Sequence, residues 1–127
     1  MSSTGKKILF VDDDSDFRRA TRKILETGGY EVTEAVNGKD GYEKADAGIF
    51  DLIIIDVIME SFSEGFNLIS KLVQNEKTRD VPRIIMSTLG IQQELDMIYP
   101  QDLGTISILQ KPVTKEKLLE TVASACA

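Results

Sequence analysis

Short apolar runs alternate along this chain with longer segments in which apolar residues recur at helical spacing. Some runs are apolar at every position, as "LIII" at 52–55 is, which is typical of parallel strands covered by helices on both faces. The pattern predicts five strands, at residues 7–11, 31–36, 52–55, 83–86 and 106–109.

The segments between these strands predict five helices. The first should begin at an Asp14 or Ser15 cap and end at Gly28 and Gly29. Its predicted inward face consists of Phe17, Ala20, Thr21, Ile24 and Leu25. The second helix is predicted at about 39–47, with Asn37 as cap, and the third at 66–74, with Phe66, Ile69 and Val73 inward. The fourth is predicted at 92–98. The last begins after Thr114 and has one apolar side, which consists of Leu118, Leu119, Val122 and Ala123. Strict alternation predicts an α/β fold, an open and doubly wound five-stranded parallel sheet with five helices.

Length and composition narrow the functional classes. We expect one domain over residues 1–127, with no output domain, since the 127 residues contain no recognisable linker or repeat. A net charge of −6 disfavours nucleic acid and anionic membrane surfaces as partners. No apolar run approaches the roughly 20 residues that cross a bilayer, so we expect a cytoplasmic protein. The absence of histidine excludes catalytic histidine, histidine metal ligands and a phosphohistidine on this chain.

Polar residues follow four of the five predicted strands. Asp12 and Asp13 come after the first strand, Asp56 after the third, Ser87 after the fourth and Lys111 after the fifth. Ligands of such sheets bind beyond the carboxyl ends of the strands, and in the common order 2-1-3-4-5 the first and third strands are neighbours. Three converging carboxylates would stay ionised only with a cation among them, and an open crevice of oxygen donors suits Mg²⁺. The set suggests a phosphoryl acceptor.

Four motifs in this order and spacing carry a family resemblance. "ILFVDDD", "LIIIDVIM", "IIMST" and "LQKPV" resemble the receiver domain of two-component response regulators, over about residues 6–126. The resemblance implies a flavodoxin-like fold with strand order 2-1-3-4-5.

The resemblance also implies roles at the acidic end of the sheet. Asp56 would be the phosphoacceptor, and Asp13 and Asp56 would bind Mg²⁺ through their carboxylates. Ile58 would bind the metal through its backbone carbonyl, and Asp12 directly or through water.

Ser87 and Lys111 would contact the phosphoryl group on Asp56, the serine through its hydroxyl and the lysine through its charge. The implied donor is a phosphohistidine on a sensor histidine kinase or a histidine phosphotransfer protein. An unidentified downstream protein would bind the switched surface, near the fourth helix and fifth strand. The chain would be a signalling domain with only self-phosphotransfer and slow self-dephosphorylation, not an enzyme acting on outside substrates.

The chain departs from the family at several positions. After Asp56, Glu60 replaces the usual proline and Gly65 comes one residue late, so the loop "VIMESFSEGF" should differ in conformation. Ile58 and Leu89 are apolar and should shield an acyl phosphate from water. Comparing the lifetime of the phosphoryl group on Asp56 in wild type and in Ile58→Asn would test this. Ile108 replaces the usual aromatic switch residue, so we expect segment 89–103, with Tyr99, to rearrange instead. Spectra with and without beryllofluoride would test this.

Two other functions stay open at this point. One is a receiver fold that no longer accepts phosphate and acts by docking. The other is a phosphohydrolase of the haloacid-dehalogenase type, although those enzymes place an acid two residues after the nucleophile, where this chain has Ile58.

Overall fold

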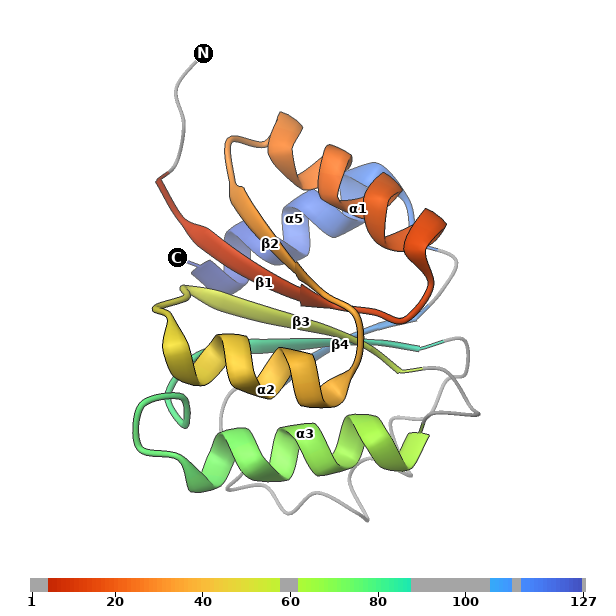
Figure 1. The fold of residues 1–127 in the computed structure, drawn as a ribbon. Helices are drawn as coiled ribbons and strands as arrows, with labels where there is room; N and C mark the ends of the chain where they lie inside the picture. The colour runs from red at the N-terminus through yellow and green to blue at the C-terminus, as the bar shows by residue number, and fades with distance from the viewer. Residues whose placement is uncertain (1–4, 58–61, 88–105, 111–112, 127) are drawn as a thin grey trace.

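A parallel sheet forms the centre of the computed structural model, which describes residues 5–57, 62–87, 106–110 and 113–126. Its five strands lie in the order β2-β1-β3-β4-β5 (Figure 1), which confirms the predicted order. The strands are β1 (Lys7–Val11), β2 (Glu31–Ala35), β3 (Leu52–Val57), β4 (Arg83–Ser87) and β5 (Ile106–Gln110). β3 runs two residues beyond its predicted end, so Asp56 lies within the strand and not after it.

Helices cover both faces of the sheet. They are α1 (Ser15–Thr27), α2 (Gly38–Ala47), α3 (Phe62–Gln74) and α5 (Lys115–Cys126). α1 and α5 lie on one face, and α2 and α3 on the other (Figure 1). The helix predicted at 92–98, the segment 89–103 with Tyr99, and residues Ile58 and Glu60 all lie outside the described residues. Within the described ranges, no helix has the length and apolar character to cross a membrane.

The strand residues alternate between two hydrophobic cores. On β1, Ile8 and Phe10 pack under α1 and α5, whereas Leu9 and Val11 pack under α2 and α3. β3 follows the same alternation, and its residues from Leu52 to Ile55 are at most 1% exposed. Because both faces are covered, every position of these strands can be apolar, as the sequence pattern indicated.

Helix ends follow the predicted capping residues. Asp14 caps α1, and its side chain accepts hydrogen bonds from the backbone N–H groups of Asp16 (3.0 Å) and Phe17 (3.1 Å). Asn37 caps α2 by accepting from the N–H of Asp40 at 2.8 Å. Gly29, just after α1, has a φ of 89°, a conformation that glycine adopts without steric cost. Local sequence therefore specifies where these helices begin and end.

The predictions for α3 were partly wrong. The helix begins at Phe62, four residues earlier than predicted, so Gly65 is helical and not part of a loop. A mid-helix glycine costs about 1 kcal/mol, which burial of the α3 face can offset. That face consists of Leu68, Ile69 and Leu72, each at most 2% exposed, while Val73 is half-buried. Stripes at i, i+1 and i+4 suit a helix packed on a flat sheet.

Two small residues also differ from their predicted positions. Ala20 of α1 and Ala123 of α5 are exposed, although helical spacing placed them on the inward faces. The buried stripes are narrower and consist of Thr21 and Leu25 on α1, and Leu118 and Val122 on α5. A single methyl group contributes little apolar area, so alanine can lie at the edge of a stripe at small cost.

Candidate functional site

The register of the strands brings Asp12 and Asp56 to the same edge of the sheet. Val11 of β1 pairs with Ile55 of β3, so the aspartates that follow them lie at neighbouring positions. The N–H of Asp12 continues the pairing with β2 by donating to the carbonyl of Ala35 at 3.0 Å. This edge is the carboxyl end of the sheet, where ligands bind in doubly wound folds.

Asp12 and Asp56 also share a face of the sheet. Phe10 and Ile54 pack into the core under α1 and α5, and each aspartate lies two residues further along its strand. Asp12 is only 2% exposed, and one carboxylate oxygen of each aspartate, Oδ2 of Asp12 and Oδ1 of Asp56, is buried. The carboxylates of Asp12 and Asp56 therefore lie at one edge and on one side of the sheet.

Ser87 is the last residue of β4 and lies one position beyond Asp56 in the sheet. Its backbone pairs with Val57 on one side and with Gln110 on the other, while Asp56 pairs with Met86. Lys111 follows Gln110 but lies outside the described residues, as does Ile58. The strand ends predicted to carry the site therefore meet at one edge, and the position of Lys111 stays a prediction.

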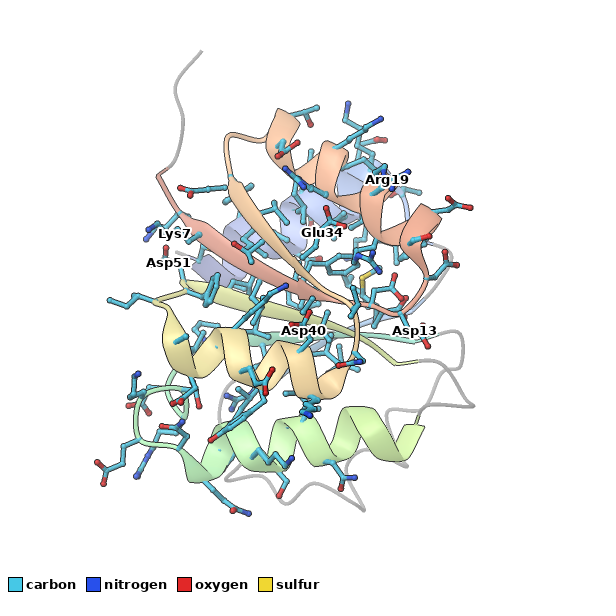
Figure 2. All side chains as sticks on the ribbon, in the orientation of Figure 1. Lys7, Asp13, Arg19, Glu34, Asp40 and Asp51 are labelled. Atoms are coloured by element: carbon cyan, nitrogen blue, oxygen red, sulfur yellow. The ribbon has the colours of Figure 1, made fainter. Side chains whose placement is uncertain are left out.

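The consecutive acids after β1 have different environments. Oδ1 of Asp12 accepts a hydrogen bond from the N–H of Asp14 at 3.0 Å, which folds the chain back over the buried Asp12. Asp14 turns its own carboxylate to the α1 N-terminus as the cap. Asp13 is exposed and lies beyond the end of β1, at the opposite edge of the sheet from Lys7 and Asp51 (Figure 2). The crowded acids therefore divide into one buried, one exposed and one capping residue.

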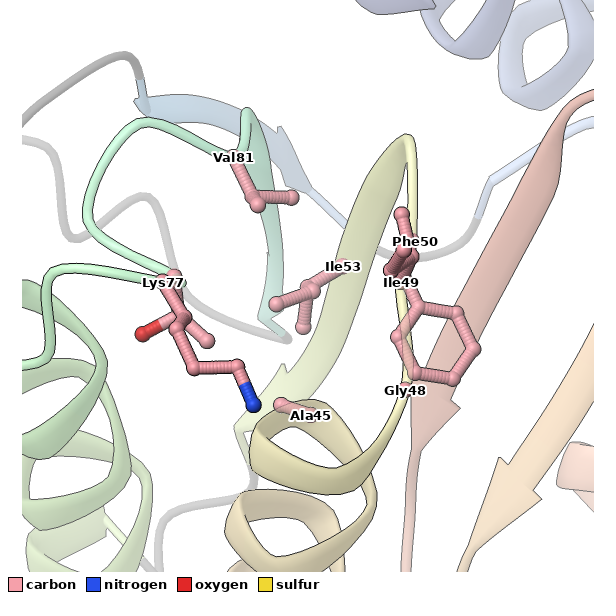
Figure 3. A pocket seen from close by; sticks show the side chains of 8 residues that line it. Ala45, Gly48, Ile49, Phe50, Ile53, Lys77 and Val81 are labelled. Carbon is pink, nitrogen blue, oxygen red and sulfur yellow. The ribbon is translucent and has the colours of Figure 1, made fainter.

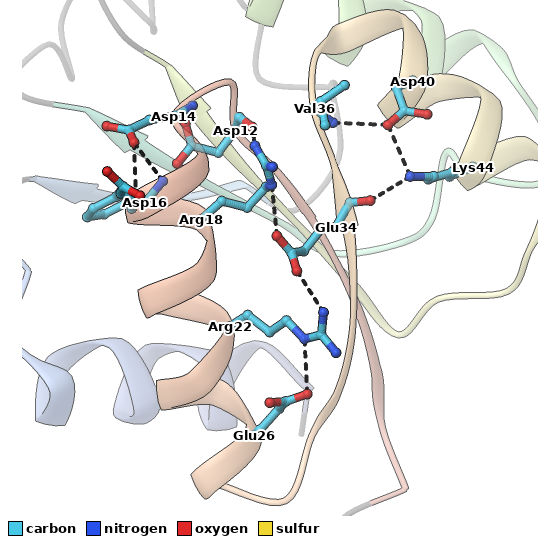
Figure 4. Close-up of polar contacts among 11 residues, drawn as sticks. Asp12, Asp14, Asp16, Arg18, Arg22, Glu26, Glu34, Val36, Asp40 and Lys44 are labelled. Atoms are coloured by element: carbon cyan, nitrogen blue, oxygen red, sulfur yellow. Dashed lines mark hydrogen bonds and ion pairs between the residues drawn. The ribbon is translucent and has the colours of Figure 1, made fainter.

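A hydrogen-bond network connects this loop to α1 and β2 (Figure 4). Arg18 of α1 donates from Nη1 to the backbone carbonyl of Asp12 and from Nε to Oε1 of Glu34, both at 2.8 Å. The other oxygen of Glu34, Oε2, accepts from Arg22 Nη1 at 2.7 Å, and Arg22 also pairs with Glu26 at 3.1 Å. The carbonyl of Asp12 is thus held by an arginine that is itself anchored on β2.

Charged neighbours shift two carboxyl groups beside this network. Hydrogen bonding from Arg22 is the main reason that the pKa of Glu34 lies below its ordinary value, and Arg18 adds to the shift. The pKa of Asp40 is also lowered, first by the N–H of Val36 and then by Lys44. Lys44 Nζ in turn donates to the carbonyl of Glu34 at 2.6 Å. Both acids therefore stay ionised at neutral pH.

The donor chemistry of this edge suits a hard cation. Asp12, Asp13 and Asp56 offer carboxylate oxygens, the ligand type that Mg²⁺ takes. Among the described residues, no group of three His, Cys, Asp or Glu side chains forms a ready metal cluster. Mg²⁺ commonly uses one or two protein carboxylates and keeps several waters, so an open site with few direct ligands still fits it. The metal roles of these aspartates and of Ile58 stay predictions.

A separate hollow lies at the opposite end of the sheet (Figure 3). It measures about 260 Å³ and is bordered by the end of α2, the start of β3 and the α3–β4 connection, including Ile49, Phe50 and Ile53. Its polar borders are already engaged, because Lys77 Nζ donates to the carbonyl of Asp46 and the Thr78 hydroxyl donates to the carbonyl of Leu72. The hollow lies toward the amino end of β3, under α2 and α3, and Asp56 does not border it, so it is not part of the candidate site.

Sequence reasoning missed Arg18 and Glu34 as partners of the acidic loop. A signal was present, since Arg18 lies one turn into the helix after the acids and Glu34 is a charged residue in an otherwise semi-buried strand. Neither feature identifies the other, because the two residues are 16 positions apart and meet only when α1 packs across β2.

Known proteins resemble this chain over nearly its whole length. The family model of the response regulator receiver domain matches residues 8–123. PilH of Pseudomonas aeruginosa is 32% identical over 121 residues, covering 95% of this chain and 98% of PilH. The chemotaxis protein CheY of Treponema pallidum is 33% identical, covering 93% of this chain and 81% of CheY. The transcriptional regulator RpaA of Synechocystis is 34% identical, and the chain spans 47% of its length.

Solved structures show the same fold. The Vibrio cholerae chemotaxis protein CheY4 superposes with a TM-score of 0.84 at 28% identity, covering 96% of this chain and 99% of CheY4. TrrA of Thermotoga maritima, solved in complex with Mg²⁺ and BeF, matches with a TM-score of 0.77 at 24% identity, covering 94% and 98% of the two chains. With its flavodoxin-like parallel sheet and the family match over residues 8–123, the chain belongs to the response regulator receiver domains, the signalling domains of two-component systems.

Proposed function

We propose that this chain is a phosphoacceptor switch in which Asp56 receives a phosphoryl group in a Mg²⁺-dependent reaction. The observation that carries the proposal is the β1–β3 register, which sets Asp56, with one buried carboxylate oxygen, beside Asp12 at the carboxyl edge. Nucleophile and metal-binding acids must lie together for such a transfer, and they come here from separate strands.

The proposed transfer forms one bond and breaks another. A carboxylate oxygen of Asp56 attacks the phosphorus of a phosphohistidine, the P–N bond breaks, and the released imidazole takes a proton from solvent. The chain contains no histidine, so the donor must be another protein, a sensor histidine kinase or a histidine phosphotransfer protein. Mg²⁺, when bound, would neutralise charge on the phosphoryl oxygens. The Ser87 hydroxyl and the Lys111 ammonium would contact the same oxygens.

The proposed output is a change in a protein-binding surface near the expected fourth helix and β5. Ile108 of β5, paired with Ile85 of β4, takes the position of the usual aromatic switch residue. We therefore assign the switch to segment 89–103 and its downstream partner to an as yet unidentified protein. Because Ile58 is not an acid, turnover of an outside phosphate ester is not expected.

Intact mass after incubation with acetyl phosphate and Mg²⁺ tests the proposal. Wild type should gain one phosphoryl group, and Asp56→Asn or chelation of the metal should abolish the gain. Asp51→Asn is the matched control, because Asp51 lies next to the start of β3, where its carboxylate accepts from the N–H of Lys7 at 2.8 Å. It should be phosphorylated like wild type. No mass gain in wild type would favour the docking module, and an unchanged gain in Asp56→Asn would move the acceptor elsewhere.

A further inference from the structure

We propose that Arg18 is a positioning residue, which holds the backbone carbonyl of Asp12 so that the Asp13 carboxylate is presented to Mg²⁺. This inference rests on the proposed metal-dependent phosphotransfer and concerns a residue that would touch neither the metal nor the phosphoryl group. Arg18 acts through the peptide unit that joins Asp12 to Asp13.

The Arg18 side chain is well placed to fix that peptide. It is 12% exposed, and its fork reaches the Asp12 carbonyl and the Glu34 carboxylate at 2.8 Å each. A planar guanidinium with two anchored nitrogens loses little freedom on forming each bond, and a charged donor makes a stronger hydrogen bond than a neutral one. The Asp12 carbonyl therefore has a donor that is itself held in one orientation (Figure 4).

Two other contacts hold the same loop through atoms outside that peptide unit. The Asp12 N–H donates to Ala35 at 3.0 Å, and Oδ1 of Asp12 accepts from the N–H of Asp14 at 3.0 Å. Rotation of the Asp12–Asp13 peptide would leave the first of these contacts intact and would swing the exposed Asp13 side chain. The hydrogen bond from Arg18 opposes that rotation directly, so its loss should cost Mg²⁺ affinity.

Simple electrostatics predicts the opposite change in Mg²⁺ affinity on removal of Arg18. Arg18 places a positive charge near a cation site, so its removal would tighten Mg²⁺ binding if charge alone mattered. Glu34 compensates much of that charge at 2.8 Å, and the exposed remainder is screened by salt. We therefore expect the positional effect to outweigh the repulsion.

Arg22 separates the two effects. It lies one helical turn further from the acids and pairs with the same Glu34 carboxylate at 2.7 Å, but its other ion pair goes to Glu26. Arg22→Met changes the net charge of the network by the same amount as Arg18→Met while leaving the bond to Asp12 intact. A purely structural link between α1 and β2 would also be weakened by either change.

Titration of the unphosphorylated full chain with Mg²⁺ tests the proposal. Binding is monitored through the amide chemical shift of Asp13. Arg18→Met should weaken Mg²⁺ binding about tenfold, at the lower end of what losing an outer-shell partner costs. Arg22→Met should change the affinity less than about twofold. Arg18→Lys, which keeps one donor, should fall between Arg18→Met and wild type. The carbonyl ¹³C shift of Asp12 without metal should move in Arg18→Met and stay unchanged in Arg22→Met.

Thermal unfolding without Mg²⁺ shows whether each variant folds, and Arg18→Lys carries the test if Arg18→Met does not. Equal or tighter Mg²⁺ binding in Arg18→Met, or an equal loss in Arg18→Met and Arg22→Met, would overturn the positioning role. A wild type that neither binds Mg²⁺ nor accepts phosphate would overturn the proposed function as well. A wild type that is phosphorylated, with Arg18 variants of unchanged affinity, would overturn only this inference.

Discussion

Gly41 of α2 lies close against Val11 of β1, the residue before Asp12, and this close approach predicts that Gly41→Ala destabilises the fold. Gly41 is buried in the middle of α2, where alanine would normally be the better helix former by about 1 kcal/mol. A Cβ at this position would lie 2.8 Å from Val11 Cγ2, 3.2 Å from Val11 Cγ1 and 3.4 Å from Leu68 Cδ2. Carbon atoms pack at about 3.5–4.0 Å, so the first contact is about 0.7 Å too short.

The stiffness of Val11 determines whether the steric clash outweighs the gain in helix propensity. Val11 is 4% exposed, lies in a strand paired on both sides, and has a branched side chain with few rotamers. It cannot turn away, so α2 must move outward, and overpacking of this kind costs about 1–3 kcal/mol. After the gain of about 1 kcal/mol in helix propensity, Gly41→Ala should lower the free energy of unfolding by up to about 2 kcal/mol.

Urea unfolding of four proteins measures this as a double-mutant cycle: wild type, Gly41→Ala, Val11→Ala and the double variant. Val11→Ala alone should cost about 2 kcal/mol through the cavity it leaves. With alanine at position 11 the new Cβ has room, so the second substitution should be neutral or stabilising and the two should couple by more than about 1 kcal/mol. A Gly41→Ala protein more stable than wild type, or costs that add within about 0.5 kcal/mol, would refute the packing argument.

Three further predictions concern charged residues. Arg83 is 1% exposed and donates to three backbone carbonyls at 3.2–3.4 Å. Arg83→Met should therefore lower the free energy of unfolding, measured in urea, by about 1–2 kcal/mol. Unchanged stability would mean that water replaces the guanidinium as donor to these carbonyls. Hydrogen bonding from Arg22 lowers the pKa of Glu34 in the folded state, so its stabilisation is complete above the unfolded pKa of about 4.3 and is lost as pH falls through the folded pKa. Wild type should therefore lose up to about 1 kcal/mol more than Glu34→Gln on acidification to about pH 3, and parallel stability curves would contradict this. In EDTA at about pH 7, Asp13→Asn should raise the free energy of unfolding by about 0.5 kcal/mol, because it removes repulsion among the acids. Asp16→Asn should lower the free energy of unfolding by a similar amount, because it removes a negative charge from the first turn of α1. A change in the same direction for both variants would contradict these different roles of Asp13 and Asp16.

The sheet could be predicted from the sequence because most of the strands are local apolar runs and the family motifs gave the order. The strand ends could not be predicted as well. β3 extends to Val57 because Asp56 and Val57 pair with Met86 and Ser87, and that pairing depends on a strand about 30 positions away in the chain. α3 begins early for a similar reason, since its packing against the sheet offsets a glycine that local propensity disfavours.

That Asp12 and Asp56 lie at one edge of the sheet could also be predicted, because parallel strands present all their carboxyl ends there. What holds these acids could not. The bond from Arg18 to Asp12 depends on how α1 crosses the sheet, and the close approach of Gly41 to Val11 depends on how α2 does. Both are tertiary contacts between residues whose types fit many other environments. A motif therefore indicates candidate groups for the reaction, while the contacts that hold those groups in place come from packing that the motif does not encode.

These supports come from opposite faces of the sheet and act on adjacent residues of one strand end. Gly41 lets α2 press directly on Val11, and Arg18 of α1 holds the carbonyl of Asp12, the next residue. Because it is fixed from both sides, the acidic loop should keep its shape before a cation binds. The repulsion among its acids is then overcome during folding and not during Mg²⁺ binding. Mg²⁺ affinity should then depend on how firmly this strand end is held, and global stability should be a poor guide to it. Arg83, buried at the amino end of β4, stabilises the fold at a distance from the loop, so its loss should lower stability and leave Mg²⁺ affinity nearly unchanged.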